Sequence, residues 1–212
     1  MPYGSIFGST QPANGRGHAG GPRDHRFAST VRLWAEKFGR IFANQIRRRS
    51  RGQLGDKWHL DEAVISIGGE KHWLWRAVDQ DGFVLEVLVQ SRRNAKAANR
   101  LMRKLLKGQG RAPRVMVTDK LRSYDAARRE IMPGVEHRSH KGLNNRAENS
   151  HQPVRQRERI MKRFKSQRQL QRFVSIHDPI ANLFHIPRHD ISVSHHRELR
   201  AAGGLAPTII IL

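Results

Sequence analysis

Apolar residues along the chain follow a helical period first and a strand period afterwards. From Trp34 to Ile46 they recur at near-helical intervals, and Ser29 or Thr30 just upstream can cap the helix. After Gly55 the apolar residues mix with β-branched and aromatic residues, which is typical of strands. The pattern therefore predicts one long helix followed by a sheet.

Three strand-like segments come next, separated by turn signals. They are KWHLDEAVISI, KHWLWRAVD and FVLEVLVQ, with Gly68-Gly69 after the first and Asp81-Gly82 after the second. Glycine pairs and Asp-Gly between such segments are hairpin signals, so an antiparallel meander is predicted. A helix over residues 94–107 and a short buried strand, RVMVTD, follow. This crossover favours a parallel fourth strand and hence a mixed α/β sheet.

The remaining chain is predicted to be mainly helical. Residues 121–131 have a helical pattern, 135–140 form a candidate short strand, and 169–184 form an apolar helix that Pro179 is able to interrupt. The order of elements is the one expected for a ribonuclease-H-like domain, a mixed sheet with flanking helices.

A long polar helix is predicted between the short strand and the last helix. It begins near Asn144 or Asn145, carries Glu148 early and ends at about Phe164. Pro153 marks either a kink or a first-turn position, and the second alternative moves the helix start past Glu148.

The chain is predicted to hold one principal domain. Its 212 residues, 37% of them hydrophobic, suffice for a single core. We divide the chain into four segments: a disordered or disrupted N-terminal arm, 1–28; a basic helix, 29–52; the α/β domain, 53–186; and an unpatterned tail, 187–212.

Charge points to a polyanionic partner. Lys and Arg number 40 against 18 Asp and Glu, a net charge of +22, and such a surface repels itself unless a polyanion such as nucleic acid neutralises it. A membrane surface is the alternative, but the basic residues are spread along the whole chain. The basic residues at the end of the first helix have two interpretations. They contact phosphate, or they are solvated and complement the helix dipole. The candidate DNA contacts are Arg47, Arg48, Arg49, Arg146, Arg155, Arg157, Lys162 and Arg163.

The chain has no cysteine, which excludes disulfides and thiolate chemistry and leaves oxygen or imidazole as metal ligands. The N-terminus lacks the apolar core of a secretory signal, and no apolar stretch approaches the roughly 20 residues that span a bilayer. We therefore expect a soluble cytoplasmic protein that associates with the nucleoid.

Three acids are the candidate catalytic and metal-binding residues. Asp61 interrupts an apolar strand, and Asp119 ends the buried fourth strand, at the edge where open α/β sheets place ligands. Two such acids repel each other and favour Mg²⁺ or Mn²⁺, and phosphodiester cleavage commonly uses two ions. Glu148 is the third candidate. Glu158 is its rival, although neighbouring arginines explain Glu158 more simply as a salt-bridge partner.

The segments Trp58–Glu62, Leu74–Asp79, Val117–Asp119 and Asn144–Pro153 together resemble the core of insertion-sequence transposases of the IS-six type. The resemblance implies a ribonuclease-H-like catalytic core whose DDE triad maps onto Asp61, Asp119 and Glu148. It also implies metal-dependent cleavage and strand transfer of element ends, carried out by a homo-oligomer on element ends and target DNA. The resemblance runs from about Val31 to about Leu199.

The chain departs from this family in two ways. Residues 120–147, which separate the last two acids, are fewer than in better-studied members, and only the end of a helix-turn-helix is recognisable, from Ser29 onward. We therefore expect a truncated or frame-disrupted copy with an intact core, which binds DNA with little preference for its own terminal repeats. A non-catalytic DNA-binding remnant and a ribonuclease-H-type nuclease acting on hybrids are the alternative functions.

Several aromatic and histidine residues have more than one interpretation. Packing is the simpler role for Trp58, Trp73 and Trp75, with base stacking as the alternative. His59 and His151 flank two of the candidate acids, so each is a candidate for orienting a carboxylate or contacting a phosphate.

Overall fold

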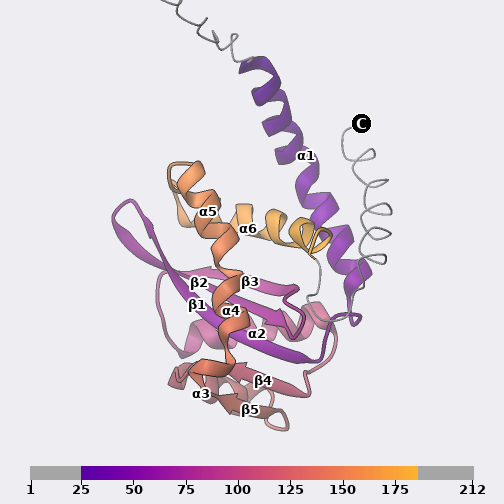
Figure 1. The fold of residues 1–212 in the computed structure, drawn as a ribbon, viewed down its shortest axis with the longest axis vertical. Helices are drawn as coiled ribbons and strands as arrows, with labels where there is room; N and C mark the ends of the chain where they lie inside the picture. Colours follow the sequence, from indigo (N-terminus) through magenta and orange to yellow (C-terminus); the bar gives the residue numbers. More distant parts are fainter. Residues whose placement is uncertain (1–24, 186–212) are drawn as a thin grey trace, which may run out of the picture.

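The computed structural model describes residues 25–185, which form a five-stranded sheet with helices on both faces (Figure 1). The elements are α1 (His25–Ser50), β1 (Lys57–Ile67), β2 (Glu70–Asp79), β3 (Val84–Gln90), α2 (Ala95–Gln109), β4 (Val115–Thr118), α3 (Arg122–Ile131), β5 (Glu136–Ser139), the 3₁₀ helix η1 (Lys141–Leu143), α4 (Asn145–Ser150), α5 (Gln152–Ile160) and α6 (Gln167–Asn182).

The sheet has the strand order β3-β2-β1-β4-β5. β1 pairs antiparallel with β2, and β2 with β3, as the hairpin signals predict. β4 lies parallel to β1, and β5 lies parallel to β4. The α/β class and the ribonuclease-H-like order predicted from the sequence are therefore confirmed, with β1 and β4 as central neighbours.

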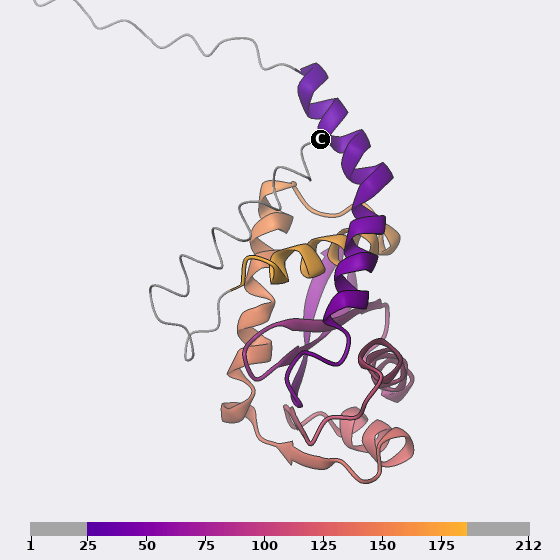
Figure 2. The same cartoon turned by 90° about the vertical axis from the view of Figure 1, so that its right-hand side faces the viewer.

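Residues of β1 face two cores, one on each side of the sheet. Trp58 and Leu60 pack with residues of α2 and α3. Ile65 and Ile67 pack on the other side with residues of α5 and α6, among them Val174. Figure 2 shows α2 and α3 on one side of the sheet and α4 and α5 on the other. Both faces of the sheet are thus covered by helices.

The predicted long polar helix is in fact two helices, α4 and α5. Pro153 lies in the first turn of α5, and Glu148 lies on α4. Proline lacks an N–H group but is well tolerated in the first turn of a helix, so it starts α5 rather than kinking a longer helix. The helix ends at Ile160, before the predicted end at Phe164.

Pro179 lies inside α6 without ending the helix. A proline cannot donate the hydrogen bond to the carbonyl four residues earlier, which here belongs to Ser175. That carbonyl accepts a hydrogen bond from Arg47 of α1 instead. Pro179 therefore does not interrupt the last helix, as the sequence had left open, and Arg47 joins α1 to α6.

Helix α1 begins at His25, so the predicted cap at Ser29 or Thr30 is wrong. Of the predicted arm, residues 25–28 belong to this helix, and residues 1–24 lie outside the described range, as does the predicted tail from 187. A Cβ atom on Gly39 would lie 3.0 Å from Cγ2 of Ile176, so glycine permits the close approach of α1 to α6. The N-terminal end of α1 extends away from the sheet (Figures 1 and 2). The exposed apolar side chains of α1 are Leu33, Trp34, Phe38 and Ile41.

Candidate active site

The end of β4 creates an acidic edge in the sheet. The last pair between β1 and β4 joins Leu60 to Thr118, so β1 continues beyond it without a β4 neighbour. Asp61 and Glu62 come next on β1, and Asp119 comes next after β4. One carboxylate oxygen from each of these three acids lies within 4.8 Å of the others. The structure thus brings Asp61 and Asp119 together and adds Glu62, which the sequence analysis did not select.

Glu62 is the most enclosed of the three acids, with a side chain only 1% exposed. Its Oε1 accepts a hydrogen bond from Nε of Arg93 at 2.6 Å, and its Oε2 accepts one from the Tyr124 hydroxyl at 2.7 Å. Burial raises the pKa of Glu62, and the hydrogen bonds from Tyr124 and Arg93 oppose that shift. Burial also raises the pKa of Tyr124, so its hydroxyl keeps the proton that it donates.

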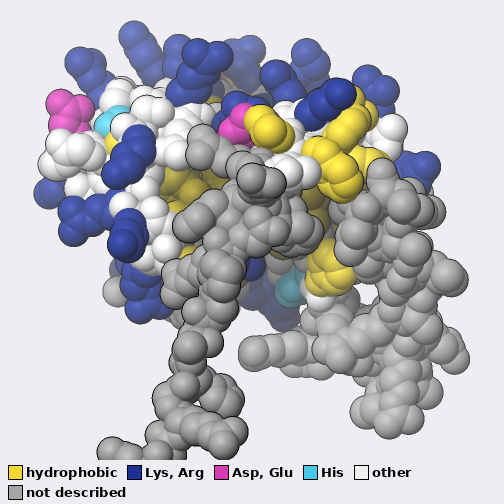
Figure 3. Space-filling view, turned by 90° about the horizontal axis from the view of Figure 1, so that it is seen from above, with side chains coloured by type: hydrophobic (Ala, Val, Ile, Leu, Met, Phe, Trp, Pro, Cys, Tyr) yellow, Lys and Arg dark blue, Asp and Glu magenta, His cyan; other side chains and the backbone are white. Residues whose placement is uncertain are grey.

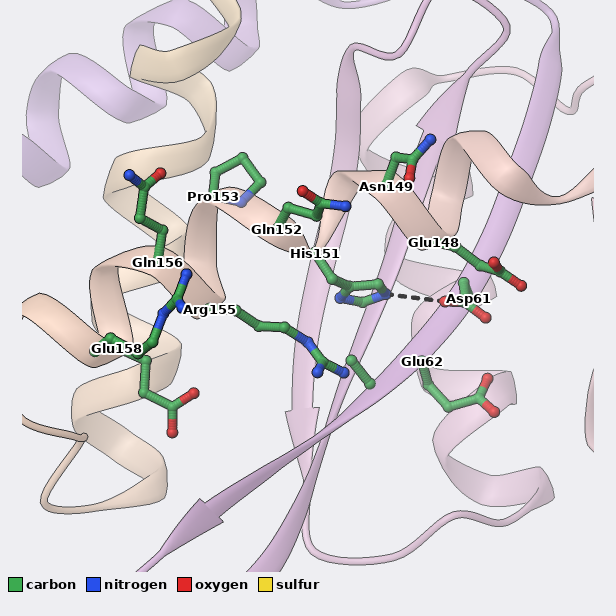
Figure 4. A pocket seen from close by; sticks show the side chains of 12 residues that line it. Asp61, Glu62, Glu148, Asn149, His151, Gln152, Pro153, Arg155, Gln156 and Glu158 are labelled. Carbon is green, nitrogen blue, oxygen red and sulfur yellow. Dashed lines mark ion pairs between the residues drawn. The ribbon is translucent and has the colours of Figure 1, made fainter.

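Asp61 lies on the opposite face of β1, next to His151. Nε2 of His151 is 3.2 Å from Oδ2 of Asp61 (Figure 4). Burial lowers the pKa of His151, and the contact with Asp61 opposes that shift. His151 is 3% exposed, so its position suits orienting Asp61 rather than contacting a phosphate. His59 is also buried, and burial together with Lys57 and Arg146 lowers its pKa to about 4.

Helix α4, which carries Glu148, is anchored to the sheet at both ends. At its start, Nδ2 of Asn144 donates a 2.8 Å hydrogen bond to the carbonyl of Leu60. At its end, Arg76 of β2 donates a hydrogen bond to the carbonyl of Ser150. These anchors hold a helix of only six residues, Asn145–Ser150, beside the acidic edge.

A cleft of about 1060 Å³ runs from the acidic edge along α4 and α5. Glu148 points toward the Asp61 end of this cleft, whereas Glu158 lies at the other end (Figure 4). Glu148 is not part of the group of oxygens within 4.8 Å, so it faces the acidic edge without joining it. The cleft is lined by Asp61, Glu62, Ala63, Glu148, Asn149, His151, Gln152, Pro153, Arg155, Gln156, Glu158 and Arg159.

Most of the candidate DNA contacts are exposed, and they lie in two places. Arg48 and Arg49 are at the end of α1. Lys162 and Arg163 follow α5 with φ values of 53° and 73°, a left-handed conformation that is unusual for residues other than glycine. Figure 3 shows Lys and Arg side chains around the rim of one face of the molecule, with few acids among them. The exposed candidates on α4 and α5 are Arg146, Arg155 and Arg157.

The tryptophans of the sheet are mainly packing residues. Trp58 and Trp75 are 1% and 0% exposed, and the ring of Trp75 meets that of Tyr124 edge-on with centroids 5.5 Å apart. Trp73 is only partly buried, and the guanidinium of Arg93 lies 5.2 Å from its ring centroid. Base stacking by Trp58 or Trp75 would therefore require opening the core.

Comparison with known families decides which class of protein carries this site. Residues 55–186 match the family model of a DDE domain, of the IS240 transposase type. The chain belongs to this family. The matched range begins just before β1 and ends just after α6, so it contains the whole sheet and all the residues of the acidic edge.

Curated relatives of this DDE domain include two transposases of Staphylococcus aureus. They are the transposase for the insertion sequence-like element IS431mec and that for the insertion sequence element IS257 in transposon Tn4003, each 28% identical over 134 residues, or 61% of this chain and 59% of the relative. The chain therefore spans about 59% of the length of these relatives. An uncharacterized protein of Yersinia pseudotuberculosis is 32% identical over 77 residues, 35% of this chain and 72% of that protein.

Similar solved structures are more distant. The catalytic core domain of BIV integrase has a TM-score of 0.45 at 13% identity and covers 73% of this chain and 99% of its own. The catalytic domain of Mos1 mariner transposase has a TM-score of 0.39 at 14% identity and covers 69% and 86%. These similarities are weak, and the fold rests on the strand order of the sheet.

Sequence reasoning missed Glu62, Arg93 and Tyr124. The only signals were the position of Glu62 beside Asp61 and of Arg93 just before the cap of α2, Asn94.

Among residues 25–185, no helix is long and apolar enough to cross a membrane.

Proposed function

We propose that this DDE domain is the catalytic part of a transposase that cleaves insertion-sequence ends and joins them to target DNA. The observation that carries the proposal is the acidic edge, where oxygens of Asp61, Glu62 and Asp119 lie within 4.8 Å of one another. The whole chain of 212 residues has a net charge of +22. Clustered carboxylates favour cations, while the basic surface favours a polyanion, and phosphodiester chemistry requires both.

Asp61 and Asp119 would hold the metal, with Glu148 completing the site. The donor set fits Mg²⁺ or Mn²⁺ because all three ligands are carboxylates, and these ions prefer oxygen. Two bound ions would activate the attacking oxygen and stabilise the leaving oxygen of an in-line displacement. Glu62 is less suited to be a ligand, because both of its oxygens already accept hydrogen bonds.

The protein's own residues would orient the acids and the DNA. Nε2 of the buried His151 lies 3.2 Å from Oδ2 of Asp61 and would orient that carboxylate. Arg155 extends from α5 across the cleft toward β1 (Figure 4), which supports a role in contacting a DNA backbone that enters there. Glu148 is exposed on α4 and lines the same cleft as Asp61, and it would turn toward a bound cation to become a ligand.

We further propose that the protein acts as a homo-oligomer on element ends and target DNA, in the cytoplasm on nucleoid DNA. The exposed apolar side chains of α1 support an association between copies, because contiguous apolar surface commonly marks an interface. Under this proposal, α1 retains part of a DNA-binding element, and its exposed Arg48 and Arg49 contact phosphate. Mass measurement of the protein on DNA carrying two element ends tests this, and a monomeric complex would contradict it.

The catalytic proposal can be tested with a plasmid that carries the gene and its flanking DNA. Purified protein with Mg²⁺ should nick this DNA, expose 3′-hydroxyl ends and join them to a second plasmid. Binding without any metal-dependent nicking would instead support a DNA-binding remnant. Degradation of an RNA–DNA hybrid without strand joining would instead support a ribonuclease-H-type nuclease.

Replacing Arg155 with Gln should weaken binding to all duplex sequences to a similar extent. Each phosphate contact releases about one counterion, so the slope of log affinity against log salt should fall by about 1. Salt titrations of duplex binding measure this slope. Arg129→Gln is the matched control, because Arg129 is 71% exposed on α3 and paired with Asp125. An equal loss of slope in both variants would show that the cleft is not the preferred path of the DNA.

A further inference from the structure

Arg93 is held at the acidic edge by three separate contacts. Its Nε donates to Oε1 of Glu62 at 2.6 Å, and its Nη2 lies 3.4 Å from Oδ2 of Asp119. Its guanidinium lies 5.2 Å from the ring centroid of Trp73, within the range of a cation–π interaction. The guanidinium is therefore fixed beside a proposed metal ligand.

Glu62, which accepts the shortest hydrogen bond from Arg93, has a buried side chain. The side chain of Glu62 is 1% exposed, and its second oxygen accepts the hydrogen bond from Tyr124. Tyr124 is fully buried and packed against Trp75. The buried Tyr124 and Glu62 thus connect the core to Arg93, whose side chain reaches the surface. Fixing an arginine in this way removes rotamer freedom before any ligand arrives.

The end of this chain remains open to solvent. The side chain of Arg93 is 37% exposed, although Glu62 and Asp119 are 1% and 23% exposed. A DNA phosphate that approaches the metal ligands brings further negative charge to three clustered carboxylates. A planar guanidinium at this point can bind two phosphate oxygens at once.

We propose that Arg93 is a phosphate-binding residue of the active site, and that Glu62 and Tyr124 are the positioning residues that fix its guanidinium beside Asp119. This inference rests on the proposed transposase function. Arg93 is absent from the basic residues selected from the sequence, and it lies on the α2 side of the acidic edge, opposite Arg155. The scissile phosphate would thus be held between cations from both faces of the sheet.

The test compares Arg93→Gln with Arg103→Gln. Arg103 is on α2 and pairs with Glu130, and their side chains are 66% and 55% exposed, so it controls for the loss of one surface cation. The single-turnover rate of strand transfer by the wild-type protein with Mg²⁺ is the reference. Arg93→Gln should reduce the single-turnover rate about 10²- to 10³-fold, as expected for removing one fixed donor to a developing charge, while Arg103→Gln stays within about two-fold.

Two readouts that need no catalysis separate this role from a simple counter-charge. In duplex binding without divalent metal, Arg93→Gln should lower the salt slope by about 1. The second readout is calorimetric titration with Mn²⁺ alone. If Arg93→Gln binds Mn²⁺ more tightly than wild type and keeps the wild-type salt slope in duplex binding, the proposal is overturned, because Arg93 would then only neutralise the acids. An inactive wild-type protein would contradict the proposed function, whereas an active Arg93→Gln protein would contradict this inference alone.

Tyr124→Phe tests the positioning role. It removes the hydroxyl that holds Glu62 and keeps the aromatic packing and all charges. We expect a rate loss of about 10-fold with an unchanged salt slope, because the guanidinium is still present but less well fixed. Arg93→Lys in the same assay should keep the salt slope and lose most of the rate, since an ammonium lacks the planar fork. Full activity in either variant would show that the orientation of Arg93 is unimportant.

Discussion

Asp61→Asn, Asp119→Asn and Glu148→Gln should each lower the rate of Mg²⁺-dependent strand transfer by at least about 10³-fold. A bound metal ion supplies several kcal/mol of stabilisation to the transition state, and each 1.36 kcal/mol is a factor of ten in rate. Affinity for duplex DNA should stay within about two-fold, because these acids are assigned to metal binding and not to phosphate contact. Strand-transfer assays and gel shifts on the same preparations measure both quantities.

Glu158→Gln is the matched control for the third acid. Glu158 lines the same cleft but lies far from Asp61 in Figure 4, so its loss should leave strand transfer nearly unchanged. Normal activity in Glu148→Gln together with loss in Glu158→Gln would show that the third ligand was assigned to the wrong helix. Thermal unfolding of each variant checks that loss of activity does not come from loss of fold.

The sheet and two of its acids could be predicted from local patterns. The hairpin glycines and the strand period gave β1, β2 and β3, and the placement of Asp119 after a buried strand put it at a strand tip. The proximity of Asp61 followed once β1 and β4 were expected to be neighbours. These features depend on short-range periodicity and on the ordinary connectivity of mixed sheets.

Glu62 could not be selected in this way, because neighbouring residues of a strand point to opposite faces. That rule separates Glu62 from Asp61 only where the sheet continues on both sides. Here β4 ends at Thr118, and beyond its tip the oxygens of both acids can approach Asp119. The length of β4 relative to β1 is a tertiary feature, and no local pattern in the sequence records it.

The anchoring of α4 was also beyond the sequence. A helix of six residues is too short to be stable by itself. Its position depends on two hydrogen bonds between residues far apart in the chain. Asn144, just before α4, bonds to Leu60 of β1, and Arg76 of β2 bonds to Ser150 at the end of α4. The periodicity of the polar segment therefore suggested one long helix, whereas the anchors and Pro153 divide it into two.

Breaking the buried ion pair between Arg76 and Asp178 should destabilise the fold by about 3–5 kcal/mol, the cost of leaving one charge buried without its partner. Nη2 of Arg76 lies 2.5 Å from Oδ2 of Asp178, and their side chains are 2% and 3% exposed. His177 also contacts Asp178, with Nδ1 3.0 Å from Oδ1. For Arg76→Met, a chain of this size should lose roughly 10 °C or more in its unfolding midpoint. Calorimetry or circular dichroism measures this shift, and a change below about 1 kcal/mol would show that the pair is not a buried charge in solution.

The double variant Arg76→Met with Asp178→Leu separates stability from positioning. Replacing both partners of a buried ion pair with apolar residues is often neutral or stabilising, so most of the lost stability should return. Strand transfer should not return with it, because the carbonyl of Ser150 still lacks the hydrogen bond from Arg76 that anchors the end of α4. Glu148 lies on that helix, so its carboxylate should reach the acidic edge less often, and the rate should stay about 10-fold or more below wild type. Recovery of both stability and rate in the double variant would mean that Asn144 alone suffices to hold α4, and that Arg76 serves only the core.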